Sequence, residues 1–296
     1  MVLGSKIPPL VISTSPSCHL DNFPFVISTK RSAWRDLIKI AESLELSAFL
    51  CTFANKYNME MNAKRILKYL RQIAANNNRA WYLEHKAEYD VVRAEFEQGI
   101  AQALERIITF DPEVAHLQVK DCTYRFNRDT RFSPDKSPYK NHLGAYICAN
   151  GKKALRGGYY LHLEPGHCLL SVGNYWLPTN ILTSCRNEIM GNTDAWLQCV
   201  ENQEFLKYFA DKGTLTMNES WDQPQGFGLE KLKTCPSGFP RDWPYVRYLR
   251  LKDYCAWHAV PDSFFDGDGW LDEMERILLA AKPMMDFMNA VIDDYE

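Results

Sequence analysis

The sequence predicts an α+β domain: an antiparallel sheet of meander hairpins packed against N-terminal and C-terminal helices. Hydrophobic residues recur every three to four positions between residues 61 and 108, every second position between 122 and 172, and every three to four positions again after residue 270. Tight-turn pairs, Asn150-Gly151 and Pro165-Gly166, follow the central strands. Such close spacing favours antiparallel hairpins, because a parallel connection needs a longer crossover.

Residues 61–296 are predicted to form this single domain, and residues 1–60 an N-terminal extension. The extension carries one short helical pattern, which is too small to bury a core of its own. Met59 and Met61 stand immediately before the strongly patterned region. We therefore interpret residues 1–60 as a segment that is poorly ordered or that precedes the natural start of the protein.

The helical pattern of the domain begins at Met61–Ala75, where three asparagines then stop the helix and suit the start of the next one. A long helix follows, with one apolar stripe from Tyr89 to Ile107, and ends at Asp111-Pro112. Further helices are expected over 178–190, over 194–210, after a cap at Asp242, and over 270–292 with a cap at Asp268 and a kink at Pro283.

Alternating hydrophobic residues predict the strands of the sheet. They are expected over Cys122–Phe132, Leu143–Cys148, Tyr159–Glu164, Cys168–Val172 and Tyr254–Val260. In the third of these strands, apolar residues alternate with Tyr160, His162 and Glu164, so these three share one face.

The composition narrows the class of protein. The chain has 296 residues and a formal net charge of −3, so no field over the whole protein attracts nucleic acid or an anionic membrane. Its nine cysteines include no CxxC pair, which argues against a disulfide framework and fits reduced thiols in the cytoplasm. No apolar run approaches the roughly 20 residues of a membrane span, and no glycine-rich phosphate loop occurs. We therefore expect a cytoplasmic protein without a membrane partner or a cofactor.

The densest group of cations lies in the stretch FNRDTRFSPDKSPYKNH, residues 126–142. Strict alternation places Arg128 on the same strand face as Phe126 and Phe132, where a buried guanidinium needs an anionic partner. The predicted ligand-binding side chains are Arg125, Arg128, Arg131, Lys136, Tyr139, Lys140 and Tyr160. Cross-strand ion pairs on a solvated face are the alternative interpretation of the same residues.

A pocket is predicted where the polar face of strand 159–164 meets the basic stretch. If both line the same side of the sheet, they bring together arginines, an imidazole, a carboxylate and a phenol. Mixed polar sites of this kind bind ligands and shift pKa values. We predict His162 or Asp129 as the acid–base group, with Glu164 orienting the histidine.

The same region contains an HxExxH pattern formed by His162, Glu164 and His167. These residue types can bind a metal ion, but the spacing matches no strong metal motif. Hydrogen-bonded histidines are therefore the expected interpretation, and no metal site is predicted.

The run RDTRFSPDKSPYK, residues 128–140, resembles the signature of a family called "domain of unknown function 2461". Three further stretches resemble the same family: Ile66–Tyr89, Gly157–Pro178 and Leu232–Val260. The resemblance covers roughly Ala63–Asn289. It implies the limits of the domain and the importance of the basic run, but it implies no reaction.

Three functions remain open from the sequence. The first is an enzyme or sensor that binds a phosphorylated or carboxylated small molecule through the basic strand and loop. The second is a non-catalytic nucleic-acid binder, which the negative net charge disfavours. The third is an interaction module whose basic loop binds an acidic protein. The sequence does not decide the oligomeric state, the ligand or whether the protein is an enzyme.

Overall fold

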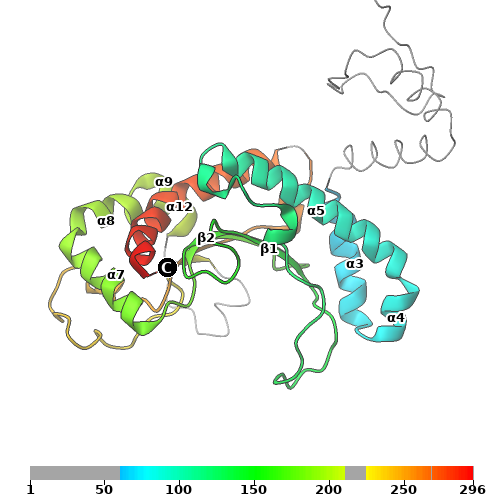
Figure 1. The fold of residues 1–296 in the computed structure, drawn as a ribbon, viewed down its shortest axis with the longest axis horizontal. Coiled ribbons are helices and arrows are strands. Elements are labelled where there is room, and N and C mark those ends of the chain that lie inside the picture. Colours follow the sequence, from blue (N-terminus) through cyan, green and yellow to red (C-terminus); the bar gives the residue numbers. More distant parts are fainter. Residues whose placement is uncertain (1–60, 211–224, 268, 296) are drawn as a thin grey trace, which may run out of the picture. The chain divides into compact units, whose positions relative to one another are not determined.

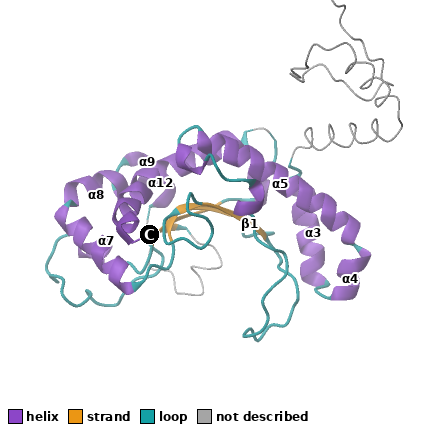
Figure 2. Cartoon of the chain, in the orientation of Figure 1, coloured by secondary structure: helices purple, strands orange, loops and turns teal. Residues whose placement is uncertain are grey.

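The structure is a computed structural model that describes residues 61–210, 225–267 and 269–295 (Figure 1). The predicted N-terminal extension and the predicted cap Asp268 lie outside the described residues. The described elements belong to one unit, Glu60–Glu296. They combine a sheet of five strands with helices, so the predicted α+β class is confirmed (Figure 2).

Three helices open the described chain, and asparagine caps set where two of them begin. The side chain of Asn62 accepts a hydrogen bond from Arg65 N–H at 2.9 Å before α3 (Ala63–Ala75). The side chain of Asn78 accepts one from Trp81 N–H at 3.0 Å before α4 (Arg79–Glu84). These bonds satisfy amide groups that a helix start leaves without partners. The long α5 (Lys86–Ile108) then packs against α3.

The sheet has the strand order β1-β2-β3-β5-β4, and each pair of neighbours is antiparallel. The predicted meander is formed by β1 (Leu143–Ile147), β2 (Gly158–Leu163) and β3 (Leu169–Asn174). The chain returns to the sheet with β5 (Tyr254–Ala259), which pairs with β3, and the short β4 (Gly226–Phe227) pairs with β5. The sheet therefore combines a local meander with strands added from later in the chain.

Helices between β3 and β5 differ from the prediction in two places. The elements are α7 (Thr179–Gly191), α8 (Thr193–Val200), α9 (Gln203–Phe209) and α11 (Val246–Leu249). The prediction of one helix over 194–210 is wrong, because the structure has α8 and α9 there. The side chain of Asn202 accepts a hydrogen bond from Phe205 N–H at 2.9 Å, and this cap marks the start of α9 as a separate helix. Asp242 does not cap α11, which begins after Tyr245.

The last long helix, α12 (Trp270–Ile292), covers one face of the sheet and contacts α5 (Figure 1). Its Met284 and Met288 are fully buried, as are Tyr159 and Val172 of the sheet. The helix continues through Pro283, which removes one backbone donor. Shorter helical turns complete the described chain: η1 (Pro112–Val114), α6 (Val119–Cys122), η2 (Asp262–Phe265) and η3 (Asp293–Tyr295).

The strand predicted over Cys122–Phe132 is wrong. The described residues of this segment form only isolated bridges, which pair Thr123 with Ala145 and Asn127 with Tyr139. Phe132, expected on a buried face, is 93% exposed. The segment instead leaves the sheet as a long loop, which we call the basic loop (residues 126–140).

Backbone hydrogen bonds close the base of the basic loop. Arg128 N–H donates to the carbonyl of Pro138 at 2.9 Å, and Lys140 N–H donates to the carbonyl of Phe126 at 3.0 Å. Pro134 and Pro138 cannot donate hydrogen bonds to a strand ladder, which explains why the alternating pattern does not continue as a strand.

None of the helices in the described part of the chain has the length and apolar character to span a lipid bilayer.

Candidate functional site

A pocket of about 600 Å³ lies on the face of the sheet opposite to α12. Alternate residues of β2 separate the two faces. Tyr159 and Leu161 are buried in the core beside the helices, whereas Tyr160 and His162 line the pocket. The predicted polar face of this strand is therefore the wall of a cavity large enough for a small molecule.

The strand register arranges the pocket wall in rows. One row crosses four strands and consists of Tyr146, Tyr160, Ser171 and Trp257. The adjacent row consists of Gly158, Gly173 and Cys255. Aromatic rings thus lie beside positions with very small side chains, and the pocket occupies the space that larger side chains would fill.

Two glycines of this wall cannot be replaced without a collision. A Cβ atom at Gly158 would lie 2.4 Å from the carbonyl oxygen of Ile147. A Cβ atom at Gly173, whose φ is +127°, would lie 2.2 Å from the carbonyl oxygen of Tyr254. The close approach of neighbouring backbones therefore requires glycine at both positions.

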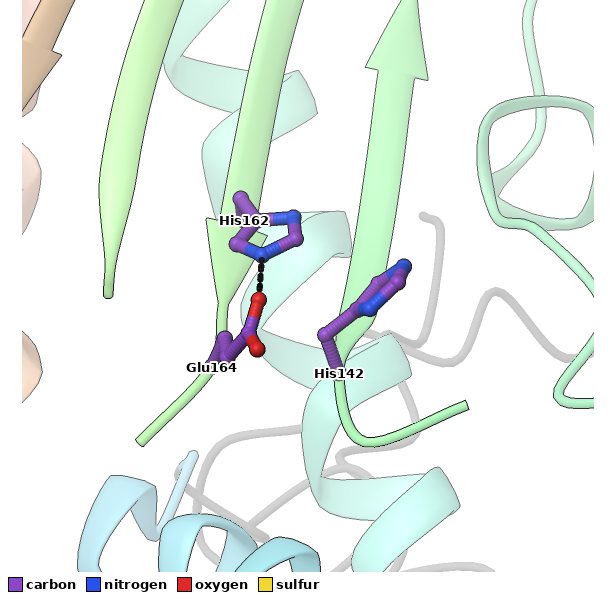
Figure 3. A group of neighbouring side chains, drawn as sticks. All are labelled: His142, His162 and Glu164. Carbon is purple, nitrogen blue, oxygen red and sulfur yellow. Dashed lines mark hydrogen bonds and ion pairs between the residues drawn. The ribbon is translucent and has the colours of Figure 1, made fainter. Parts of the chain in front are cut away.

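A chain of hydrogen bonds runs along β2 at one end of the pocket. The hydroxyl of Tyr160 lies 2.8 Å from Nδ1 of His162. Nε2 of His162 lies 2.9 Å from Oε2 of Glu164, and Figure 3 shows this second contact. A carboxylate only accepts hydrogen bonds, so Nε2 carries a proton and donates it to Glu164. In the neutral ring, Nδ1 then accepts a hydrogen bond from Tyr160. Glu164 thus fixes the tautomer of His162.

His142 joins this chain from the start of the neighbouring strand (Figure 3). Its ring centroid lies 4.6 Å from that of His162. Asn141 holds the group together: its amide nitrogen donates to Oε1 of Glu164 at 2.5 Å, and its amide oxygen lies 3.2 Å from Nδ1 of His142. The two imidazoles and the carboxylate form one cluster, whose ligand atoms all lie within 4.8 Å of one another.

Burial and neighbouring charges shift the pKa values of the cluster. Burial, followed by the proximity of His162, lowers the pKa of His142 to about 4, so its ring is neutral near pH 7. Burial acts to raise the pKa of Glu164, but the hydrogen bond from His162 and the nearby imidazoles outweigh it and lower that pKa. Burial raises the pKa of Tyr160, which keeps its hydroxyl protonated.

Two lysines provide positive charge in the pocket. Lys140 Nζ lies 5.3 Å and Lys152 Nζ 5.7 Å from the centroid of the Tyr124 ring, and all three residues line the pocket. Lys152 donates hydrogen bonds to the carbonyls of Lys120 and Thr123 at 3.1 and 2.8 Å. Burial lowers the pKa of the Lys140 ammonium, and the nearby Arg125 and Arg93 lower it further. In the described part of the chain, neither lysine forms an ion pair with a carboxylate.

Apart from Lys140, the predicted cations of the basic loop, and Arg125 just before it, lie outside the pocket lining and interact mainly with the loop itself. Arg128 pairs with Asp135, and hydrogen bonds from Ser137 and then from Arg128 lower the pKa of Asp135 to about 2. Arg131 pairs with Asp129 at 2.7 Å. Lys136 Nζ donates to the carbonyl of Thr130 at 2.9 Å, and exposed Arg125 lies 4.0 Å from Asp129. The structure therefore separates Asp129 and these cations from His162, because the loop leaves the sheet before its polar face can join the wall.

Tyr139, predicted to bind a ligand, lies in an aromatic part of the core. It is 6% exposed and stacks on Tyr82 with ring centroids 4.3 Å apart. Phe126 stacks on it from the loop base at 5.6 Å. This packing anchors the basic loop to α4, which contains Tyr82. Just before that helix, the side chain of Asn77 also accepts a hydrogen bond from Tyr139 N–H at 3.0 Å.

Of the predicted site residues, the structure brings together Lys140, Tyr160, His162 and Glu164 in the pocket lining. Sequence reasoning missed His142 and Lys152. The signal for His142 was the hairpin register: β1 and β2 pair Leu143 with Leu163, so the preceding residue faces the following one across the two strands. His167 of the HxExxH pattern also lines the pocket but does not belong to the cluster.

Fold and site together define an α+β protein with a polar small-molecule-sized pocket on the face of an antiparallel sheet opposite to α12. The chain belongs to the family of conserved hypothetical proteins called DUF2461, whose model matches residues 65–287. This confirms the resemblance carried by the RDTRFSPDKSPYK run. Searches of curated proteins and of solved structures gave no match.

Proposed function

We propose that the pocket binds a small anionic molecule, phosphorylated or carboxylated, and that the Tyr160–His162–Glu164 chain accepts a proton from it. The observation that carries this proposal is the combination, in one pocket, of two lysines without carboxylate partners and a histidine oriented by a carboxylate.

The lysines supply the binding energy for an anion. Lys140 is half-buried, and burial already lowers the pKa of its ammonium, so the charge is incompletely solvated. An anionic group placed between Lys140 and Lys152 would form charge-assisted hydrogen bonds, which are stronger than neutral ones. The nearby Arg156 already pairs with Glu113 and Asp293 and has a structural role.

The hydrogen-bond chain supplies a path for a proton. The Tyr160 oxygen accepts a proton from the bound molecule while the Tyr160 proton passes to Nδ1 of His162. The resulting imidazolium is stabilised by the carboxylate of Glu164, which lies 2.9 Å from Nε2. Nucleophile–base–carboxylate arrangements use the same division of roles. In this protein the hydroxyl belongs to Tyr160, and its raised pKa disfavours a stable phenolate. The hydroxyl therefore passes a proton on as it accepts one.

Thermal unfolding in the presence of a chelator tests the binding part. The panel contains phosphate, sugar phosphates, dicarboxylates, nucleotides and short oligonucleotides. A ligand at 100 times its dissociation constant adds about 2.7 kcal/mol, which for a domain of this size raises Tm by roughly 5–10 °C. We expect one anionic class to shift the wild type and Lys136→Ala, and not Lys140→Ala. Lys136 is the matched control because it lies in the basic loop outside the pocket.

The same panel separates the alternatives. A shift by oligonucleotides alone that is lost in Lys136→Ala and falls steeply with salt would favour the nucleic-acid reading of the basic loop. Equal loss of ligand binding in Lys136→Ala and Lys140→Ala would contradict binding in the pocket. If a ligand binds through Lys140 but is not changed, and His162→Ala leaves its binding intact, the site is a sensor rather than an enzyme.

A further inference from the structure

We propose that His142, His162 and Glu164 form a binding site for a divalent transition-metal ion of the zinc class at one end of the pocket. This inference goes beyond the proposed anion binding and does not rest on it, because none of the three side chains is one of the two lysines. It shares His162 and Glu164 with the proposed proton path, which requires the metal-free state of the cluster. It also assigns the cluster a second state, in which the ion takes the place of the proton between His162 and Glu164.

The geometry is close to that of a metal site. Zinc bonds of about 2.1 Å at tetrahedral angles place two ligand atoms roughly 3.4 Å apart. Nε2 of His162 and Oε2 of Glu164 are already 2.9 Å apart, and the ligand atoms of all three residues lie within 4.8 Å of one another. These separations exceed the zinc spacing by at most about 1.4 Å. No other group of three such ligands is found in the part of the chain that the structure describes.

The backbone holds these ligands on rigid elements. His162 lies within β2, Glu164 directly follows that strand, and His142 directly precedes β1. The pairing of Leu143 with Leu163 fixes the relative positions of the two strand ends. Ligands on paired strands keep their spacing better than ligands on separate loops, which reduces the cost of ordering the site.

The donor atoms favour one class of ion. Two imidazole nitrogens and one carboxylate suit Zn²⁺, Co²⁺ and Fe²⁺, whereas Mg²⁺ and Ca²⁺ prefer oxygen ligands alone. Three protein ligands are typical of sites that keep a coordination position for solvent or a ligand. His142, His162 and Glu164 all line the pocket, so that position is accessible to a molecule bound there.

Residues around the cluster can orient the ligands. Asn141 donates to Oε1 of Glu164 at 2.5 Å, which leaves Oε2 on the side of His162. The hydroxyl of Tyr160 lies 2.8 Å from Nδ1 of His162. When an ion replaces the proton on Nε2, the ring proton moves to Nδ1 and is donated to the Tyr160 oxygen. Metal-binding histidines usually make such a hydrogen bond with their second nitrogen.

The test is a metal titration of the full chain without an affinity tag, after chelator treatment and with a non-chelating reductant. Zn²⁺ binding is measured by calorimetry and Co²⁺ binding by absorption. We expect one equivalent of ion and a Co²⁺ spectrum without a thiolate charge-transfer band, since the donors are nitrogen and oxygen. His142→Ala and Glu164→Gln should each weaken binding by more than about tenfold, and Tyr160→Phe by about 10–100-fold.

Two histidines are matched controls. His167→Ala removes the third residue of the HxExxH pattern, and His116→Ala removes an exposed histidine outside the pocket. Both variants should bind the ion as the wild type does. Unchanged binding in His142→Ala, or equal loss in His167→Ala, would overturn the assignment, as would a thiolate band or the absence of binding in folded wild type.

Circular dichroism establishes that each variant is folded, and a His142→Ala variant that does not fold is replaced by His142→Gln. Failure of the metal site is distinguishable from failure of the proposed function. Anion binding depends on Lys140 and is measured with chelator present, so each result can hold without the other.

Discussion

Replacement of Asp253 by asparagine is expected to stabilise the protein at alkaline pH. Asp253 directly precedes β5, two of whose residues line the pocket, and it is only 5% exposed. Burial, with a smaller contribution from Glu230, raises the pKa of its carboxyl group to about 7 despite a hydrogen bond from Cys255 N–H at 3.2 Å. The ordinary value is 3.8. The folded protein therefore binds this proton more tightly than the unfolded chain does.

The direction of the pH dependence follows from that difference. The stabilisation due to protonated Asp253 is complete below pH 3.8, is lost as the pH rises toward 7, and changes little above that. The full loss is on the order of 4 kcal/mol, because each pKa unit corresponds to about 1.4 kcal/mol. An asparagine cannot ionise and can still accept the hydrogen bond from Cys255. Between about pH 5.5 and pH 8, the variant should gain about 2 kcal/mol relative to the wild type.

The assay is urea unfolding of both proteins across this pH range. Asp294→Asn is the matched control, because Asp294 is an exposed carboxylate near the C-terminus. The difference between Asp253→Asn and the wild type should widen with pH, and that between Asp294→Asn and the wild type should stay within about 0.5 kcal/mol. A difference for Asp253→Asn that is constant with pH would refute the reasoning, because it would show that Asp253 ionises normally in the folded protein.

Three further outcomes are expected. Gly173→Ala should destabilise the protein by at least 2 kcal/mol more than Gly166→Ala in urea unfolding. Both glycines have positive φ, but only a Cβ atom at Gly173 would collide with a carbonyl oxygen, that of Tyr254 at 2.2 Å. Similar losses of stability in the two variants would contradict this collision. Asn289→Leu should cost about 3 kcal/mol, since the Asn289 side chain accepts buried hydrogen bonds from Gly157 N–H at 2.7 Å and Asn174 at 3.0 Å; a loss below about 1 kcal/mol would show that these donors find other partners. Arg131→Ala should leave the free energy of unfolding nearly unchanged and ligand binding in the pocket intact, because Arg131 pairs with Asp129 at the exposed surface. Loss of ligand binding would return Arg131 to the site.

The strands that could be predicted are those whose alternation is supported by neighbouring strands. Tyr159, Leu161 and Leu163 face the helices, and Tyr160 and His162 face the pocket, as the period of two indicates. The same period failed from Cys122 to Phe132. Local alternation does not show whether a partner strand exists. From Phe126 onward, the backbone of this segment forms hydrogen bonds with residues 138–140 of the same loop.

The site could be predicted only in part for the same reason. Tyr160, His162 and Glu164 are two residues apart, so their common face follows from strand geometry alone. His142 and Lys152 reach the pocket through pairing across strands and through the loop between β1 and β2. The HxExxH pattern contains His167 and not His142, because a pattern in one segment cannot show which residue of another segment lies closest.

The pocket-lining face of the sheet is costly to the fold, and that cost supports the proposal that this face binds a ligand. Glycine within a strand loses more conformational entropy than alanine, by roughly 0.5–1 kcal/mol, and adds no packing. Gly158 and Gly173 nevertheless lie side by side in the centre of the sheet. At the other end of β2, a partly buried carboxylate and two imidazoles replace the apolar residues that would stabilise the wall. The strand glycines and the buried polar groups thus lower the stability of the fold at the same pocket. Binding of an anion or a metal ion there would offset this loss.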